Sequence, residues 1–237
     1  DAGRSLLVEM ATKLRGGPHP KEVDADTLTQ DEVDFLARWI DEGARGDAGQ
    51  VPYEDVDPAR LLYVAGQGAA VVSVVDMETN LVVRTVDLQA HGFSANARPH
   101  HVAVEPDGSA WYVSLIGDGK VAKFDRENHL VGTATMETPG MLAVDPARDL
   151  LFAGRSMTAV NPPSSLGFVR RSDLAVEEVP VVFPRPHALA VGPDGHHVYT
   201  ASLAQNQLVA VDVETGDATF TPVEVDGGMH GGMAATF

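Results

Sequence analysis

The sequence contains no cysteine, and this absence removes several classes of protein at once. Disulfides, thiolate metal sites, cysteine nucleophiles and covalent attachment of a c-type haem within these residues are all excluded. The sequence also lacks an uninterrupted apolar run of about 18 residues, the length that a membrane-spanning helix needs. We therefore expect no transmembrane segment in this chain.

Basic residues are scarce, with 17 Lys and Arg against 34 Asp and Glu and a formal net charge of −17. Binding to nucleic acid is not expected, because phosphate contacts need clustered Lys and Arg. An acidic surface can instead steer basic partners, so a protein or redox partner is the expected kind. The oligomeric state is not indicated by the sequence.

One phrase recurs along the chain. Residues 98–108 read RPHHVAVEPDG, and residues 185–195 read RPHALAVGPDG, 87 positions later. A weaker copy, PGMLAVDPAR, occupies residues 139–148. A period of about 40–50 residues with several short strands in each unit is typical of a β-propeller. We therefore predict a mostly β fold, a β-propeller with about four blades and a short N-terminal α-helical segment.

Each complete repeat predicts an inner strand, a tight turn and three further strands. Pro, Asp and Gly in the turn respectively preset φ, bond the local backbone and accept a positive φ. The strands are expected at 101–104, 110–114, 120–125 and 130–135, then at 141–144, 150–154, 166–170 and 175–179, then at 189–191, 197–201, 207–212 and 218–223.

The first repeat differs from the others. Residues 57–66 match residues 145–154, two repeats later, so this unit begins at its second strand and lacks an inner one. Residues 229–237 read as an inner strand without the rest of its blade. Either that strand completes the first blade of a closed four-bladed ring, or further blades follow. We favour the second arrangement, in which the chain is a fragment and part of a seven-bladed ring.

The repeats resemble those of YVTN-type bacterial propellers. The resemblance rests on the Pro-His and Pro-Asp-Gly phrases and on the strands that begin Trp111-Tyr112 and Val198-Tyr199, and it covers residues 57–237. It implies a seven-bladed fold and a periplasmic or extracellular location. Members of the family serve as binding platforms, surface-layer components or parts of redox enzymes, so the resemblance does not select one function.

Residues 1–50 do not fit the repeat and form a separate helical segment, with residues 51–237 making the propeller. A helix is expected over 5–14, ended by Gly16-Gly17. Thr29 and Glu32 form a capping box for a second helix, whose apolar side chains include Val33, Leu36, Trp39 and Ile40, and Gly43 ends it.

This segment resembles the C-terminal half of a class I cytochrome c domain. The resemblance rests on residues 28–44, which look like its last helix, and on residues 5–20, which look like the segment that carries the distal haem ligand. It implies a haem c attached upstream of Asp1, because the haem-attaching Cys-x-x-Cys-His motif is absent. His19, in a Gly-Gly-Pro-His-Pro loop, stands where the distal iron ligand would be; otherwise it is a surface loop histidine.

Four histidines lie at the starts of inner strands: His100, His101, His187 and His230. Inner strands line a propeller's channel, so these side chains could converge at one mouth and bind copper, zinc or iron. Copper-cluster propellers such as nitrous oxide reductase place histidines in comparable positions. The alternative, which we favour, is that each imidazole hydrogen-bonds the backbone of a neighbouring blade.

These observations lead to three hypotheses about function. The leading one is an exported propeller protein associated with electron transfer, in which a cytochrome c-like domain is fused to a binding propeller. The second is a non-enzymatic protein-interaction platform, and the third is a metal enzyme that uses copper at the channel histidines. No pairing of a nucleophile with a base stands out, so the sequence does not decide whether the chain is an enzyme.

Overall fold

The computed structural model describes residues 7–8, 28–49, 56–156, 164–202 and 204–223. The chain divides into two compact units, residues 1–56 and residues 57–237. The strand predicted at 229–237, like His19 and His230, lies outside the described residues. In the described part of the chain, no helix has both the length and the apolarity of a transmembrane span.

The first unit contains helix α2, Gln30–Asp41. The predicted capping box is present, since the Glu32 carboxylate accepts a hydrogen bond of 2.7 Å from the Thr29 amide and the Thr29 hydroxyl accepts one from the Glu32 amide. Gly43, at φ +96°, turns the chain away after the helix. Of the first predicted helix only residues 7–8 are described, and they are helical.

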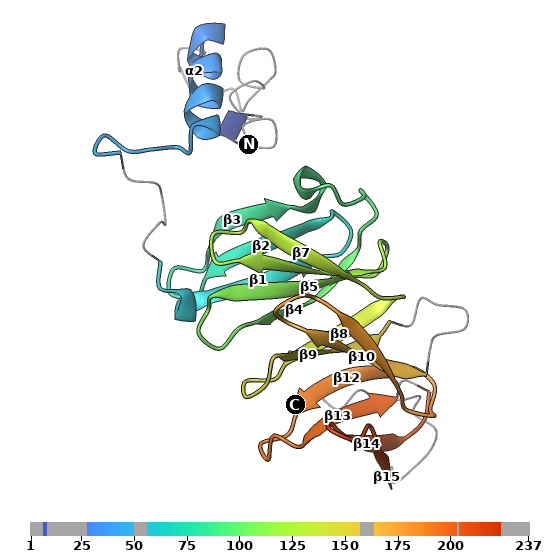
Figure 1. The fold of residues 1–237 in the computed structure, drawn as a ribbon. Helices are drawn as coiled ribbons and strands as arrows, with labels where there is room; N and C mark the ends of the chain where they lie inside the picture. Colours follow the sequence, from blue (N-terminus) through green and yellow to red (C-terminus); the bar gives the residue numbers. More distant parts are fainter. Residues whose placement is uncertain (1–6, 9–27, 50–55, 157–163, 203, 224–237) are drawn as a thin grey trace. The chain divides into compact units, whose positions relative to one another are not determined.

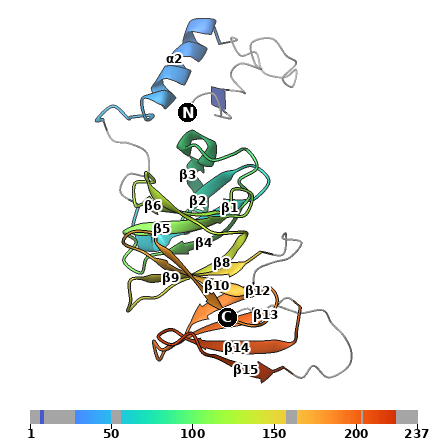
Figure 2. The same cartoon turned by 45° about the vertical axis from the view of Figure 1, so that its right-hand side comes forward.

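The second unit is a set of antiparallel sheets, each of which is one blade of a β-propeller, and neighbouring blades lie side by side in chain order (Figures 1 and 2). Blade 1 has three strands and blades 2, 3 and 4 have four each. The strands are β1 Leu61–Gly66, β2 Val71–Asp76 and β3 Leu81–Asp87; β4 Pro99–Val104, β5 Ala110–Leu115, β6 Lys120–Asp125 and β7 Leu130–Thr135; β8 Pro139–Val144, β9 Leu150–Arg155, β10 Ser165–Arg170 and β11 Val176–Pro180; β12 Pro186–Val191, β13 His197–Ser202, β14 Gln207–Asp212 and β15 Ala218–Pro222.

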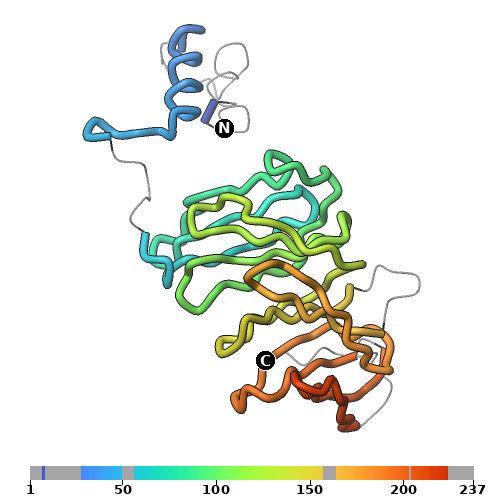
Figure 3. Tube along the Cα trace, in the orientation of Figure 1, coloured from blue at the N-terminus to red at the C-terminus, as the bar shows by residue number. Residues whose placement is uncertain are grey.

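The predicted mostly β propeller fold is therefore confirmed, and among the described residues the first blade has no inner strand. Strand β1 packs against β4 in the same way that β5 packs against β8 and β9 against β12. Because β5 and β9 are the second strands of their blades, β1 is a second strand as well. Figure 3 shows the chain passing through each blade in order and then crossing to the next.

The turns between inner and second strands form as the sequence predicts. Gly108 adopts φ +66°, and the Asp107 carboxylate accepts a hydrogen bond of 2.9 Å from the Ser109 amide. Gly195 and Asp194 repeat both features in blade 4. An ordinary residue is strained at such a φ, whereas Gly is not, so the Pro-Asp-Gly phrase specifies the turn.

Three hydrophobic clusters hold the unit together, one at each junction between neighbouring blades. Successive side chains of a strand point to opposite faces of its sheet. In β5, Trp111 therefore packs toward blade 1 while Tyr112 packs toward blade 3. In β9, Phe152 packs toward blade 4 and Leu151 toward blade 2. Each middle blade is thus buried on both faces.

Trp111 is the largest side chain in these junctions. It is 1% exposed, it stacks on Phe124 with a centroid separation of 4.4 Å, and its Nε1 donates to Asn128. We expect Trp111→Ala to lower the free energy of unfolding of the propeller by about 3–5 kcal/mol, because the cavity lies between two blades. Urea denaturation followed by far-UV circular dichroism measures this.

The second tryptophan, Trp39, supplies a matched control because it belongs to helix α2 in the other unit. Trp39→Ala should leave the propeller transition unchanged. Equal unfolding midpoints for the propeller in the two variants would contradict the assignment of Trp111 to a blade junction.

Candidate functional site

The inner strands of blades 2, 3 and 4 all start with the same backbone irregularity. Each begins at a proline, and the residue before it has a left-handed φ: 53° at Arg98, 41° at Thr138 and 57° at Arg185. A non-glycine residue in this region is strained by roughly 1 kcal/mol. Because the strain recurs at three equivalent positions, it belongs to the way the chain turns from one blade into the next.

A β-bulge follows each of these prolines. In β4, the two residues His100 and His101 lie opposite the single residue Ser114 of β5. The register of β8 and of β12 shifts at the corresponding place. Bulges redirect side chains and are common beside functional sites. The histidines predicted from the repeat thus lie on the irregular part of each inner strand.

Two of the predicted histidines come together. The rings of His100 in blade 2 and His187 in blade 4 are 5.4 Å apart between centroids, with 48° between their planes. Blade 3, which lies between them, has Gly140 at the equivalent position and so places no side chain there. A Cβ on Gly140 would approach the Arg155 carbonyl carbon to 2.8 Å, so only glycine fits.

The ring of His187 is oriented by a neighbouring blade. Its Nδ1 is 2.8 Å from the backbone oxygen of Arg155 at the end of β9. A carbonyl only accepts hydrogen bonds, so Nδ1 carries a proton, and the lone pair of the neutral imidazole lies on Nε2. Gly154 permits this approach, since a Cβ there would lie 2.6 Å from the His187 oxygen.

Arg155 itself is fully buried, and its guanidinium is bonded on every side. It donates to the backbone oxygen of Ser165 at 3.1 Å and to the backbone oxygen of Glu137 at 2.5 Å. It also forms an ion pair with the Glu178 carboxylate. These bonds fix the end of β9, and with it the Arg155 carbonyl that accepts the hydrogen bond from His187 Nδ1. Arg155 could not be identified from the sequence, because nothing in the repeat marks it.

His100 is held differently. Its Nδ1 is 3.3 Å from the amide nitrogen of Gln67, and its Nε2 is buried with no hydrogen-bond partner among the described residues. Burial, followed by the nearby His187 and Arg98, lowers the pKa of His100 below its usual value. The imidazole is therefore neutral at pH 7, which is the form that binds metal ions.

His101 has a structural role. Its Nδ1 accepts a hydrogen bond of 3.2 Å from the amide of Leu142 in β8, which links blade 2 to blade 3. This is the interaction expected of a histidine that joins neighbouring blades. Burial, with smaller effects from His100 and His187, lowers the pKa of His101 to about 4.

In the described segments of the chain, no group of three or more His, Asp or Glu side chains is placed to hold a metal ion. His230, the fourth predicted metal ligand, and His19, the predicted haem ligand, lie outside those segments. The structure thus brings together His100 and His187 and assigns His101 to a contact between blades.

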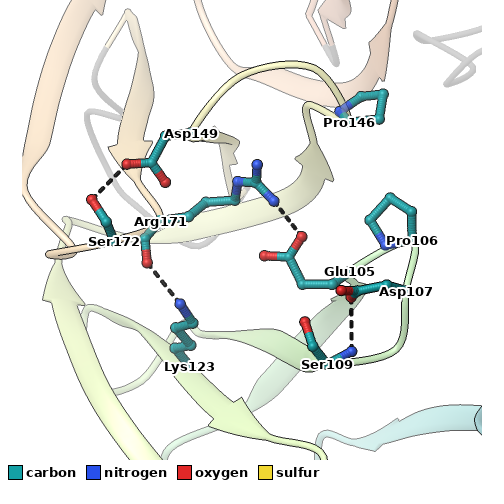
Figure 4. Close-up of a pocket in the computed structure, with 9 residues that line it drawn as sticks. All are labelled: Glu105, Pro106, Asp107, Ser109, Lys123, Pro146, Asp149, Arg171 and Ser172. Atoms are coloured by element: carbon teal, nitrogen blue, oxygen red, sulfur yellow. Dashed lines mark hydrogen bonds and ion pairs between the residues drawn. The ribbon is translucent and has the colours of Figure 1, made fainter.

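A polar pocket lies at the other end of β4, at the junction of blades 2 and 3 (Figure 4). Its volume is about 440 Å³. The turn after β4 forms one side, and the turns before β9 and after β10 form the other. The lining residues are Glu105, Pro106, Asp107, Ser109, Lys123, Pro146, Asp149, Arg171 and Ser172.

The charged groups of this pocket bind one another. The Glu105 carboxylate forms an ion pair with Arg171 of blade 3 and accepts a hydrogen bond of 2.7 Å from the Tyr112 hydroxyl. Lys123 donates to the Arg171 backbone oxygen at 2.8 Å. Burial and the adjacent Glu105 raise the pKa of Tyr112, which stays protonated. The arrangement joins two blades and offers no nucleophile paired with a base.

The sequence carries one signal for this junction, an acidic residue before the turn proline. Glu105 and Asp145 are both acidic residues placed directly before the turn proline. Asp145 is fully buried, and its Oδ2 lies 3.3 Å from Nη1 of Arg148. A carboxylate at that position in two blades indicates a recurring arginine contact.

Comparisons with solved structures place the chain among β-propellers. Kuenenia stuttgartiensis hydrazine synthase matches with a TM-score of 0.58 and 16% identity, over 70% of this chain and 48% of that chain. Virginiamycin B lyase from Staphylococcus aureus, in an inactive form with quinupristin, matches with a TM-score of 0.57 and 10% identity, over 70% of this chain and 53% of that chain. Neither a protein-family model nor a curated protein sequence matches the chain.

Identities this low support the shared fold and nothing about activity. The chain spans about half the length of these two solved proteins. The function of the chain must therefore be argued from its own residues.

The Glu105–Arg171 pair yields a stability prediction. Glu105→Gln should lower the free energy of unfolding by about 2 kcal/mol, because it leaves a half-buried guanidinium without its carboxylate. Adding Arg171→Met should recover part of that loss. As a control, Asp173→Asn breaks an exposed pair with Arg170 and should cost less than about 0.5 kcal/mol. Equal losses from Glu105→Gln and Asp173→Asn in urea denaturation would refute the prediction.

His101 yields a pH prediction. Its pKa is about 4 in the folded chain against 6.5 for an unperturbed histidine, so between these pH values the unfolded chain binds a proton that the folded chain does not. The free energy of unfolding should therefore fall as pH drops from 6.5 toward 4, by on the order of 2 kcal/mol from this residue. His101→Gln should show a smaller fall between pH 7.5 and pH 4.5. An unchanged fall in urea denaturation would show that other groups cause it.

Proposed function

We propose that this chain is the binding propeller of an exported electron-transfer protein, with residues 1–50 belonging to a cytochrome c-like domain. The proposal combines two resemblances. The blades resemble YVTN-type repeats, which favours a periplasmic or extracellular location, and the helical segment resembles the C-terminal half of a cytochrome c domain. The propeller would bind a redox partner or substrate, and the haem-bearing part would exchange the electron.

The observation that carries the proposal is the exposed apolar face of helix α2. The helix begins at the capping box that the sequence predicts, yet Phe35 is 57% exposed. Leu28, Phe35 and Leu36 line an apolar hollow of about 360 Å³ together with Asp31 and Glu32. A 12-residue helix is not stable by itself in water, and an open apolar face suits a helix that packs into a larger helical domain.

The described part of this segment offers packing surface and no iron ligand. Residues 28–49 contain no histidine, methionine or cysteine. A haem c would therefore be attached by residues outside this sequence, with His19 as its proposed distal ligand. When bound, such a haem supplies one-electron chemistry, and helix α2 would help to exclude water from it.

The test is to express the complete gene around this segment in a host that matures c-type cytochromes and to record a reduced-minus-oxidised visible spectrum of the periplasmic fraction. We expect sharp haem c bands. His19→Ala should shift those bands, because it removes an axial imidazole ligand of the iron. Unchanged bands would exclude His19 as the ligand.

His129→Ala is the matched control, because His129 lies exposed in a turn of blade 2 and bonds only its neighbour Asp125 among the described residues. A complete protein without haem bands would overturn the electron-transfer proposal. The non-enzymatic interaction platform would then be the better description, with helix α2 as a docking arm.

A further inference from the structure

We infer that His100 and His187 form a binding site for a single copper ion at the start of the propeller's inner strands. The site lies wholly in the unit formed by residues 57–237, so it does not depend on the proposed haem. Two neutral imidazoles from different blades would be its protein ligands.

The spacing of the two rings fits one shared metal ion. Bonds from transition metals to imidazole nitrogen are about 2 Å long, so two imidazoles on one ion have centroids within roughly 6 Å of each other. The observed separation between centroids is 5.4 Å. Gly140, at the equivalent position of the intervening blade 3, contributes no side chain to this space.

His187 is already arranged as a metal ligand. Metal-binding histidines usually donate their second ring N–H to a backbone carbonyl or a carboxylate, which fixes the tautomer and the ring orientation. The bond of 2.8 Å from His187 Nδ1 to the Arg155 oxygen is of this kind. Arg155, held in place by Ser165, Glu137 and Glu178, is a positioning residue for that bond.

His100 supplies the second nitrogen. Its Nε2 is buried and has no hydrogen-bond partner among the described residues, and burying a polar atom in this state is unfavourable. A metal bond would remove that cost. Turning the Gln67 amide over would place its oxygen against His100 Nδ1, which would then carry the proton and leave the Nε2 lone pair for the metal.

The ligand set favours copper over other ions. Calcium and magnesium need oxygen ligands, and structural zinc takes four ligands in a tetrahedron. In the parts of the chain that the structure describes, no third His, Asp or Glu completes such a set. Copper(I) accepts coordination by as few as two or three ligands, a bent pair of imidazoles at the observed centroid separation of 5.4 Å is compatible with it, and its single charge suits a site made of neutral ligands only. Imidazole is also among the ligands that suit copper.

The test is a competition titration of the purified chain with copper(I) and a chromophoric copper(I) chelator, without oxygen. We expect one tight site per chain. His100→Gln and His187→Gln should each weaken binding by about 100-fold or more, since each removes one of two ligands. Gln67→Ala should weaken it by about 10-fold, because it removes only a supporting bond.

His129→Gln is the matched control, since it replaces an exposed turn histidine and should leave the affinity unchanged. Circular dichroism would show that each variant is folded. Equal affinity in the wild type and in the folded His100→Gln/His187→Gln double variant would overturn the inference.

A second measurement needs no variant. In nitrogen-15 NMR spectra of the wild-type chain, copper(I) should shift the Nε2 resonances of His100 and His187 and leave their Nδ1 atoms protonated. The His187 Nδ1 proton should stay bonded to the Arg155 oxygen, and the His100 Nδ1 proton should be donated to the Gln67 side-chain oxygen. Shifts confined to other histidines would overturn the assignment of the site.

Discussion

A blade of this propeller can bury its apolar residues only between neighbours, and the rest of the structure follows from that constraint. Trp111 and Tyr112 are adjacent in β5, yet they belong to two different hydrophobic clusters on opposite sides of the sheet. A substitution in a second strand therefore affects whichever junction its side chain faces. The same constraint explains why β5, β9 and β13 hold unbroken or nearly unbroken runs of buried residues.

Polar contacts between blades then fix the ends of the inner strands. At the start of these strands, His101 reaches the Leu142 amide and His187 reaches the Arg155 carbonyl. At the end of β4, Glu105 pairs with Arg171. Apolar clusters alone would tolerate small shifts of one blade along another, whereas directional hydrogen bonds and ion pairs do not. The registration of the blades therefore depends on residues that the repeat pattern barely marks.

The sequence predicted the fold well because its signals are local and repeated. A turn such as residues 106–108 is specified by its own residues, and the capping box of Thr29 and Glu32 is complete within four positions. The approach of His100 and His187 could be anticipated in outline, since both follow equivalent prolines. Arg155 and Gln67 could not, because their roles depend on contacts between strands that are far apart in the sequence.

The paired histidines show how one repeated position can serve two purposes. A histidine that follows the first proline of an inner strand can use one ring nitrogen for a hydrogen bond to a neighbouring blade. Its other ring nitrogen then remains available to a ligand. His187 does so, because the carbonyl of Arg155 occupies only its Nδ1. His101, one residue further along the bulge than His100, joins blades through its Nδ1 alone. The bulge makes this division possible, since it lets two successive histidines lie opposite one residue of the neighbouring strand and face different partners.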